Sequence, residues 1–308
     1  MEAQPPVIRA FGDAAIGRAA ALIRAGGIVA VPTETVYGLA ADARDAAAVA
    51  GIYAAKGRPS FNPLIVHVAD LAAAQRIAAF DDEARTVAAR FWPGPLTLVL
   101  PLRDDAEIAS LVTAGLDTVA IRVPAHRAMR ALIAASAAPL AAPSANASNG
   151  ISPTLASHVA ASLGARVPLI IDDGATAAGV ESTILAGRTI LRPGPVTAEM
   201  LGAVLPVAAG TTAHVSAPGQ LDTHYAPMKP LRLEATRPRA DEWLIGFGAV
   251  AGDDTLSAAG DVAEAAARLF DALHRADASA ASAIAVAAVP ERGVGVAIND
   301  RLRRAAHR

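Results

Sequence analysis

The chain has 308 residues, none of which is cysteine, and it carries a formal net charge of −2 at pH 7. The lack of cysteine excludes disulfides, thiolate nucleophiles and cysteine-ligated zinc, and the small net charge argues against a broad nucleic-acid-binding face. No apolar run approaches the ~20 residues that cross a membrane, and the first residues lack a signal-peptide pattern, so we expect a cytoplasmic protein without membrane contacts.

Helices and short buried strands alternate along the first 209 residues. Helices are predicted where an aspartate that can cap the first turn precedes an alanine-rich stretch, namely over 13–24, from Asp45 to about Lys56, and from Asp70 and Asp81 onward. Strands are predicted at 28–31, 64–68, 96–100, 118–123, 168–171 and 182–185. Because some of these strands lie too close together for a helical crossover, we predict an α/β fold with a layered, mixed, twisted sheet and flanking helices.

A second, smaller unit is predicted in the C-terminal part of the chain. Residues 210–227 are rich in Gly, Pro, Ser and Thr and show no sustained period, which is typical of a linker. Strands are predicted at 230–234, 243–248 and 283–289, around a helix at about 261–275. The predicted parts are therefore a large domain (1–209), a linker or lid (210–227) and a small Rossmann-like α/β domain (228–308).

Four segments place charges, hydroxyls and turn residues beside predicted strand ends, where open α/β sheets usually bind ligands. They are 31–39, 56–64, 142–154 and the pair 179–184 with 191–195. In the first segment, a buried strand is expected to run into Pro32 and to expose Thr33, Glu34, Thr35 and Tyr37. An ordinary polar turn explains this segment equally well.

The second segment contains one of the few lysines of the chain. Of the 27 Lys and Arg residues, only Lys56 and Lys229 are lysines. A compact ammonium on Lys56 and a planar guanidinium on Arg58 suit a phosphate chain. The alternative is that both cations complement a helix C-terminus, which is worth ~0.3–1 kcal/mol. The scarcity of lysine favours the phosphate interpretation, whereas a lone strand histidine such as His67 more often has a structural role.

The third and fourth segments each have an ordinary explanation as well. The loop 142–154 offers backbone N–H groups and short polar side chains to an anion, but it could equally be a surface loop before a helix. Ser182, Thr183 and Arg192 suit a polyanion or a simple hairpin. Their joint occurrence indicates one cleft. No acidic cluster, Ser-His-Asp set or H-E-x-x-H box appears, so we expect neither a covalent nucleophile nor a protein-caged metal, and the metal ligands stay unassigned.

The stretches "PTETVYGLAADA", "KGRPSFNPLIVHV", "PSANASNGISPT", "GVESTI" and "RPGP" follow one another in this order. Together they resemble the YrdC-type threonylcarbamoyl-AMP synthases, and "APGQLDTHYAP" with the terminal α/β segment resembles their longer, two-domain branch. The resemblance implies that L-threonine, bicarbonate and ATP give threonylcarbamoyl-AMP and pyrophosphate, with Mg²⁺ bound mainly to the phosphates. The product would pass to a downstream tRNA threonylcarbamoyl transferase complex for threonylcarbamoyladenosine synthesis. Direct tRNA binding stays open.

The resemblance also assigns residues, with 1–209 as the YrdC-like catalytic domain. Lys56 and Arg58 are the implied catalytic residues. The implied ATP-binding residues are Arg58, Asn62, Thr118, Ser144, Asn146, Ser152, Arg192 and Tyr225. The implied threonine-binding residues are Thr35, His67, Arg122, Ala142 and Ser182, with Arg122 facing the carboxylate. Asn149 stands where the family commonly has Gly, and Asn tolerates a left-handed backbone better than most residues.

Two alternatives come from other classes of protein. A YrdC-like fold with a concave basic surface could bind double-stranded RNA or tRNA without turnover, although the net charge argues against this. Carbamoyl transfer of the hydrogenase-maturation type would require cysteine-rich zinc modules, which this chain lacks. Within the main hypothesis, the linker folds over the cleft with Tyr225 against the nucleotide; the alternative is that Tyr225 only docks the linker.

Overall fold

The computed structural model describes residues 6–210 and 225–307. None of the helices in these ranges combines the length and the apolar composition that a membrane span requires. Most of the predicted linker or lid, residues 211–224, falls outside the described residues, so its proposed closure stays a prediction.

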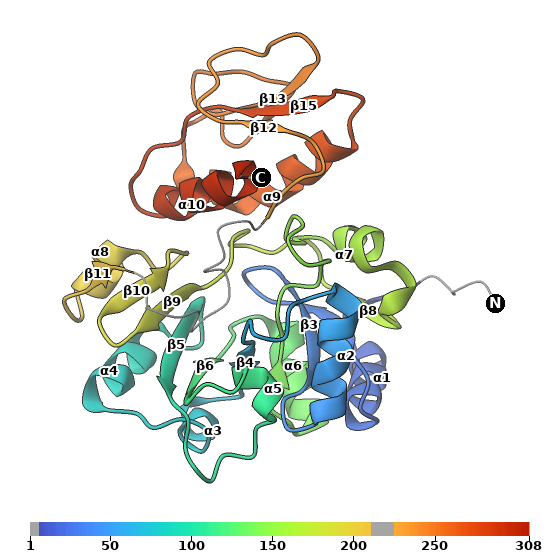
Figure 1. Cartoon of the computed structure of the whole chain (residues 1–308), viewed down its shortest axis with the longest axis vertical. Helices are drawn as coiled ribbons and strands as arrows, with labels where there is room; N and C mark the ends of the chain where they lie inside the picture. The colour runs from blue at the N-terminus through green and yellow to red at the C-terminus, as the bar shows by residue number, and fades with distance from the viewer. Residues whose placement is uncertain (1–5, 211–224, 308) are drawn as a thin grey trace.

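Residues 6–210, called the larger part below, contain a mixed sheet of eleven strands (Figure 1). In spatial order its strands are β1 (Val7–Ala10), β8 (Leu169–Asp172), β2 (Val29–Pro32), β3 (Tyr37–Asp42), β7 (Leu140–Ala141), β4 (Ile65–His67), β6 (Thr118–Arg122), β5 (Leu96–Pro101), β9 (Thr183–Ala186), β10 (Thr189–Arg192) and β11 (Ala208–Ala209). Parallel pairs such as β4 with β6 occur beside antiparallel pairs such as β5 with β6. The predicted mixed α/β sheet is therefore confirmed.

Helices flank this sheet, and three of the four predicted aspartate caps are present. The helices are α1 (Asp13–Arg24), α2 (Ala46–Lys56), α3 (Leu71–Gln75), α4 (Asp82–Phe91), α5 (Ser110–Thr113), α6 (Arg127–Ser136), α7 (Ala156–Leu163), the 3₁₀ turn η1 (Gly164–Arg166) and α8 (Ala198–Gly202). The side chains of Asp45, Asp70 and Asp81 accept backbone N–H groups of the first turns. Asp13 is not a cap, because Gly12 takes that position and Asp13 lies in the first turn, where its charge complements the helix dipole.

Successive side chains of the central strands point to opposite faces of the sheet, and each face has its own hydrophobic core. Ala30, Leu39 and Ala41 lie in the core beneath α2 and α4. Their neighbours, among them Val31 and Ala40, lie in the core beneath α1 and α6. Because successive strand residues point to opposite faces, buried strands covered on both sides read as continuous apolar runs, which is how the sequence presents them.

The C-terminal part forms a second, parallel sheet, and its predicted α/β character is confirmed. Its strands in spatial order are β12 (Leu231–Arg232), β15 (Ala283–Val286), β13 (Glu242–Gly246) and β14 (Asp254–Thr255). Two helices accompany it, α9 (Val262–Ala278) and α10 (Gly295–Ala306). The sequence predicted α9 but not α10. The limits drawn at 209 and 228 stay a prediction.

The helices of the C-terminal part lie between its sheet and the larger part (Figure 1). Val36, Ile151 and Val180 from the larger part share a buried core with residues of α9 and α10. At Gly179, whose φ is +68°, a Cβ would lie 2.2 Å from the carbonyl oxygen of Ala266 in α9, so only glycine allows this approach. The C-terminal part therefore packs directly on the loops that carry the predicted site.

Candidate active site

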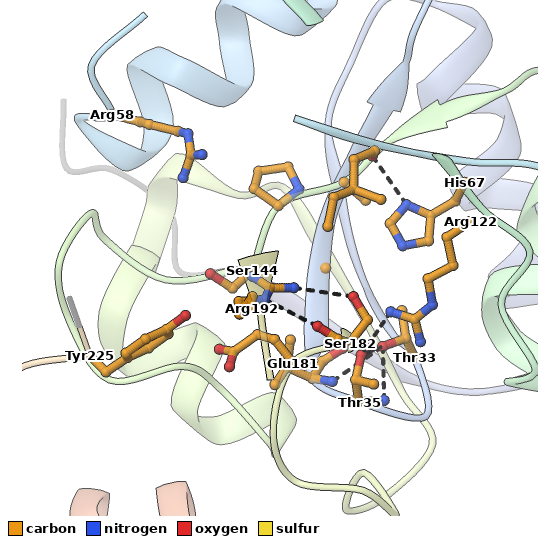
Figure 2. Close-up of a pocket in the computed structure, with 15 residues that line it drawn as sticks. Thr33, Thr35, Arg58, His67, Arg122, Ser144, Glu181, Ser182, Arg192 and Tyr225 are labelled. Carbon is orange, nitrogen blue, oxygen red and sulfur yellow. Dashed lines mark hydrogen bonds between the residues drawn. The ribbon is translucent and has the colours of Figure 1, made fainter. Parts of the chain in front are cut away.

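Strand ends bring most of the predicted site residues into one pocket (Figure 2). His67 and Arg122 are register partners at the carboxyl ends of the parallel strands β4 and β6. Nine of the predicted residues line the pocket: Thr35, Arg58, His67, Arg122, Ala142, Ser144, Ser182, Arg192 and Tyr225. Figure 2 shows Arg58 and Tyr225 on one side of the pocket and Thr35, His67 and Arg122 on the other. Residues of the two predicted sets thus line one space, and they meet where Arg192 of the ATP set donates to Ser182 of the threonine set.

Arg122 is held in a fixed orientation by three neighbours. Its Nη1 donates to Thr35 Oγ1 at 3.0 Å, and its Nε donates to the carbonyl oxygen of Gly94 at 3.1 Å. Its Nη2 lies 2.7 Å from Glu34 Oε1. Burial acts to raise the pKa of Glu34, but the adjacent guanidinium outweighs this and keeps it below its ordinary value. The planar guanidinium of Arg122, a group suited to binding carboxylates, is therefore held in place by protein contacts alone.

Thr33, Thr35 and Tyr37 are buried and Glu34 is only partly exposed, so the exposure expected for this segment is wrong. Thr33 Oγ1 donates to the carbonyl oxygen of Val36 at 2.6 Å and lies 2.8 Å from Thr35 Oγ1. Tyr37, at 0% exposure, opens β3, and its hydroxyl donates to the carbonyl oxygen of Gly174 at 2.8 Å. The chain does not end its strand at the surface here, because the threonine-stabilised turn leads it back into the sheet beside β2.

Two guanidinium groups predicted to bind ATP, those of Arg58 and Arg192, supply positive charge to the pocket. Arg58 Nε and Nη2 donate to the carbonyl oxygens of Asn62 and Pro63 at 3.2 and 3.0 Å. Arg192 Nε donates to the carbonyl oxygen of Ser182 and its Nη2 to Ser182 Oγ, both at 3.1 Å. Burial lowers the pKa of Arg58 to about 10 and lowers that of Arg192 as well. Arg58 therefore stays charged at neutral pH, as the binding of a polyanion requires.

Lys56 does not line the pocket, but it binds the loop that contributes Ser144 to the lining. Its ammonium donates to the carbonyl oxygens of Ser144 and Asn146, each at 2.5 Å. Asn146 Nδ2 in turn donates to the carbonyl oxygen of Gly150 at 2.8 Å. Burial, with Arg58 nearby, holds the pKa of Lys56 well below its ordinary range. Asn149 has φ +66°, a left-handed backbone that Asn tolerates better than most residues.

The other predicted residues outside the pocket lie at different distances from it. Asn62 is buried, and its side-chain oxygen has no hydrogen-bond partner among the described residues. Ser152 is buried and donates to Glu181, which does line the pocket. Thr118 begins β6 and Arg122 ends it, which separates the two by ~13 Å along the strand. The ATP contact predicted for Thr118 stays a prediction that this placement does not support.

Tyr225 joins the pocket to the C-terminal part. It is buried, lines the pocket and packs against Phe270 of α9 with the ring centroids 5.6 Å apart. The backbone N–H of Ala226 donates to the carbonyl oxygen of Asn149 at 2.8 Å. The tyrosine is therefore placed both to contact a ligand and to dock the end of the linker, and the predicted nucleotide contact remains a prediction.

Comparison with known proteins agrees with this geometry. Residues 21–194 match the family model Sua5_yciO_yrdC, described as "Telomere recombination", and residues 196–307 match the model described as "Threonylcarbamoyl-AMP synthase, C-terminal domain". The chain belongs to the two-domain threonylcarbamoyl-AMP synthase family. The resemblance stated from the sequence motifs is thereby confirmed.

Relatives in this family match nearly the whole chain. The threonylcarbamoyl-AMP synthase of Bacillus subtilis is 42% identical, over 96% of this chain and 93% of its own length. That of Pyrococcus abyssi is 40% identical, over 93% of this chain and 92% of its own. The crystal structure of P. abyssi Sua5 complexed with L-threonine has a TM-score of 0.90 and 38% identity, covering 97% of each chain.

Sequence reasoning named Glu34 only as a polar residue of the first segment, and it did not single out Glu181. Glu34 pairs with Arg122, and Glu181 lines the pocket. Both lie within the quoted motifs, and that is the only signal the sequence offered. Among the described residues, no group of three or more His, Asp or Glu side chains is arranged to hold a metal ion.

Buried His67 makes the folding stability of this family member depend on pH in a way that can be tested. Burial, followed by the charge of Arg122, lowers the pKa of the His67 imidazole to about 3. In the unfolded chain this histidine takes up a proton near pH 6.5, whereas in the folded chain it stays neutral. Folding stability contributed by neutral His67 is therefore present above pH 6.5 and is lost as the pH falls toward 3, by up to ~1.4 kcal/mol per pH unit.

We predict that His67→Gln loses less stability on acidification than the unchanged protein does. Urea unfolding at pH 7, 6, 5 and 4.5 measures this, and His307→Gln, at an exposed position, is the matched control. The same loss of stability with falling pH in all three proteins would contradict the prediction.

Proposed function

We propose that this chain is an L-threonylcarbamoyladenylate synthase, converting L-threonine, bicarbonate and ATP to threonylcarbamoyl-AMP and pyrophosphate. The observation that carries the proposal is one pocket lined by all five predicted threonine-binding residues and by Arg58, Ser144, Arg192 and Tyr225 of the predicted ATP-binding residues. Arg122 lies on one side of this pocket and Arg58 on the other. Relatives named threonylcarbamoyl-AMP synthase over nearly the full chain support it. So does the P. abyssi structure with L-threonine.

The proposed reaction joins an anionic carbamate, formed from threonine and bicarbonate, to a polyanion. The threonine amine combines with bicarbonate to give a carbamate and water. A carbamate oxygen then attacks the α-phosphorus of ATP as the bond to the pyrophosphate oxygen breaks. No covalent intermediate with the protein is needed, so catalysis consists of positioning the reactants and neutralising their charge.

Each group of pocket residues has a distinct part in this proposal. Arg122, held by Thr35 and Glu34, binds the threonine carboxylate, which a guanidinium fork can contact through two parallel hydrogen bonds. Arg58 and Arg192 bind the phosphates, and Asn62 holds Arg58 through its backbone carbonyl oxygen. A direct contact between the Asn62 side chain and ATP stays a prediction. Ser182 Oγ, bound by Arg192 and 2.8 Å from Thr97 Oγ1, lies where both substrates meet. Neutral His67 adds no further charge beside Arg122.

Magnesium enters the proposal only as an ion carried on the ATP phosphates. Mg²⁺ is usually held by substrate phosphates with one or two carboxylates. In the described part of the chain, the carboxylate that lines the pocket, Glu181, is already bound by Ser152 and by Arg301. The pocket therefore offers no ready-made set of protein ligands. When bound, the ion would neutralise phosphate charge.

The product suggests the next step. Threonylcarbamoyl-AMP is a mixed anhydride whose carbamoyl carbon is activated for transfer to an amine. We propose hand-over to a tRNA threonylcarbamoyl transferase complex, with a cytoplasmic location following from that role. Direct binding of tRNA to this chain is not part of the proposal.

We predict selectivity for threonine over valine, its isostere without a hydroxyl. A site that binds the hydroxyl leaves buried polar groups unpaired when valine enters, so kcat/KM for pyrophosphate release should fall by at least ~10²-fold. Serine keeps the hydroxyl but lacks the methyl group, so it should lose only about 10–200-fold, the value of one methylene. Pyrophosphate release with each amino acid, with bicarbonate and MgATP saturating, measures the difference. Equal rates with threonine and valine would refute a pocket that reads the hydroxyl.

A further inference from the structure

A buried arginine of the C-terminal part reaches the loops around the pocket. Arg301 lies on α10, and its side chain is 0% exposed. Its Nε donates to Glu181 Oε2 and its Nη1 to the carbonyl oxygen of Pro193, both at 2.9 Å. Its guanidinium carbon lies 5.3 Å from the centroid of the Tyr225 ring. One side chain therefore contacts three segments that surround the nucleotide side of the pocket.

Glu181 is the one carboxylate among the described residues that line the pocket. Its Oε1 accepts a hydrogen bond from Ser152 Oγ, and its Oε2 pairs with Arg301. Figure 2 shows the Glu181 carboxylate facing the space between Tyr225 and Arg192. A negative charge therefore lies on the side of the pocket where the proposed function places a triphosphate.

Such a carboxylate opposes phosphate binding unless its charge is compensated. Like charges a few Å apart repel strongly where water is excluded. Arg301 compensates Glu181 from outside the pocket, because it is not a lining residue. Asp300 also pairs with Arg301 Nη1, at 2.8 Å, and itself pairs with Arg304 at 3.1 Å, so the network carries two cations and two anions.

The segment after Arg192 is held by the same contacts. At Gly194 a Cβ would lie 2.7 Å from the carbonyl oxygen of Glu181, so the chain after Pro193 runs directly against the Glu181 loop. Arg301 binds both of these segments. Loss of its guanidinium therefore affects the charge of Glu181 and also the position of the strand end that carries Arg192.

We propose that Arg301 is a positioning residue for the ATP site, which compensates the charge of Glu181 and holds the Tyr225 ring, so that the pocket accepts a triphosphate. The inference rests on the proposed function, because it assumes that the nucleotide lies between Arg58 and Tyr225. It gives the C-terminal part a role in ATP binding. Stabilisation of the fold alone explains the buried Arg301–Glu181 pair poorly, because well-packed apolar residues often replace such pairs without loss of stability.

The test compares Arg301→Met, Glu181→Gln and the double variant with the unchanged protein. We expect Arg301→Met to raise KM for ATP by ~10-fold or more, since it leaves a buried charge unpaired, and to change KM for threonine by less than about threefold. Adding Glu181→Gln removes that charge and should return KM for ATP to within about threefold of the unchanged protein. Arg303→Met is the matched control, because Arg303 lies on the same helix but is 58% exposed in its pair with Glu291.

Each result distinguishes the possibilities. An unchanged KM for ATP in folded Arg301→Met overturns the inference. So does an equal rise in both KM values that Glu181→Gln does not reverse, because that pattern indicates a structural role alone. If Arg301→Met fails to fold, the double variant, which buries no unpaired charge, carries the test: a KM for ATP near that of the unchanged protein supports the inference, and one still raised ~10-fold overturns it. Calorimetry of ATP binding to the unchanged protein separates failure of this inference from failure of the proposed function. The proposed function predicts that the unchanged protein binds ATP, whatever the result for Arg301→Met.

Discussion

Arg58→Ala is expected to lower kcat/KM for ATP-dependent pyrophosphate release by at least ~10²-fold, because one charged donor facing a reacting phosphate is worth ~3 kcal/mol in a closed site. The guanidinium lines the pocket and is anchored by the carbonyl oxygens of Asn62 and Pro63. Arg58→Lys should recover part of the loss, because it restores the charge without the fork. Steady-state kinetics with ATP varied, at saturating threonine and bicarbonate, gives the ratio.

The control for this prediction is Arg18→Ala, on the exposed face of α1. It removes the same charge from a residue that does not line the pocket and should change kcat/KM by less than about twofold. Melting temperatures of both variants show whether the loop around Asn62 stays ordered. Near-normal kcat/KM in folded Arg58→Ala would contradict the assignment of the nucleotide side of the pocket.

Lys56→Met is expected to reduce both stability and activity. Lys56 is 3% exposed, and its ammonium donates to the carbonyl oxygens of Ser144 and Asn146 at 2.5 Å. Methionine fills similar volume but leaves these oxygens unpaired, at a cost of about 3 kcal/mol in the free energy of unfolding. The loop that presents Ser144 to the pocket then shifts, so kcat/KM should fall by at least ~10²-fold. Lys56→Arg should also be poor, because a larger, planar group does not fit a closely packed site.

The other lysine of the chain provides the matched control. Lys229 donates to the carbonyl oxygens of Ala276 and Ser279 at 3.0 and 2.7 Å, and so caps the end of α9 as Lys56 holds its own loop. Lys229→Met should lower the free energy of unfolding while kcat/KM per folded molecule stays within about threefold. Wild-type kcat/KM in Lys56→Met would show that the scarcity of lysine is no guide to the chemistry of this site.

Local chemistry made much of the fold predictable from the sequence. The caps at Asp45, Asp70 and Asp81 act within three residues of themselves, so the helix starts could be placed without knowledge of tertiary structure. The strand β3 was missed because the threonine-stabilised turn before it resembles an exposed strand end. The helix α10 was missed because it begins after Val294, without a side-chain cap.

The site residues likewise fall into those that the motifs identified and those that only the three-dimensional structure reveals. Motif resemblance placed Arg58, Arg122 and Arg192 in one pocket. Arg122 and Arg192 end the strands β6 and β10, whereas Arg58 follows the end of the helix α2. Their partners were beyond reach from the sequence. Glu181 meets Arg301 across 120 residues of chain, and no local pattern specifies such a pairing. Lys56, expected among the phosphates, instead binds loop carbonyls, a distinction that depends on the three-dimensional path of residues 142–154.

The most direct test of the proposed activity follows one carbon atom. The purified chain is incubated with L-threonine, ¹³C-bicarbonate, ATP and Mg²⁺, pyrophosphate is quantified, and the nucleotide products are analysed by mass spectrometry. We predict threonylcarbamoyl-AMP carrying a single ¹³C, formed in equal amount to pyrophosphate and only when all three substrates are present. RNA binding without any turnover, or a threonyl-AMP product formed without bicarbonate, would contradict the account.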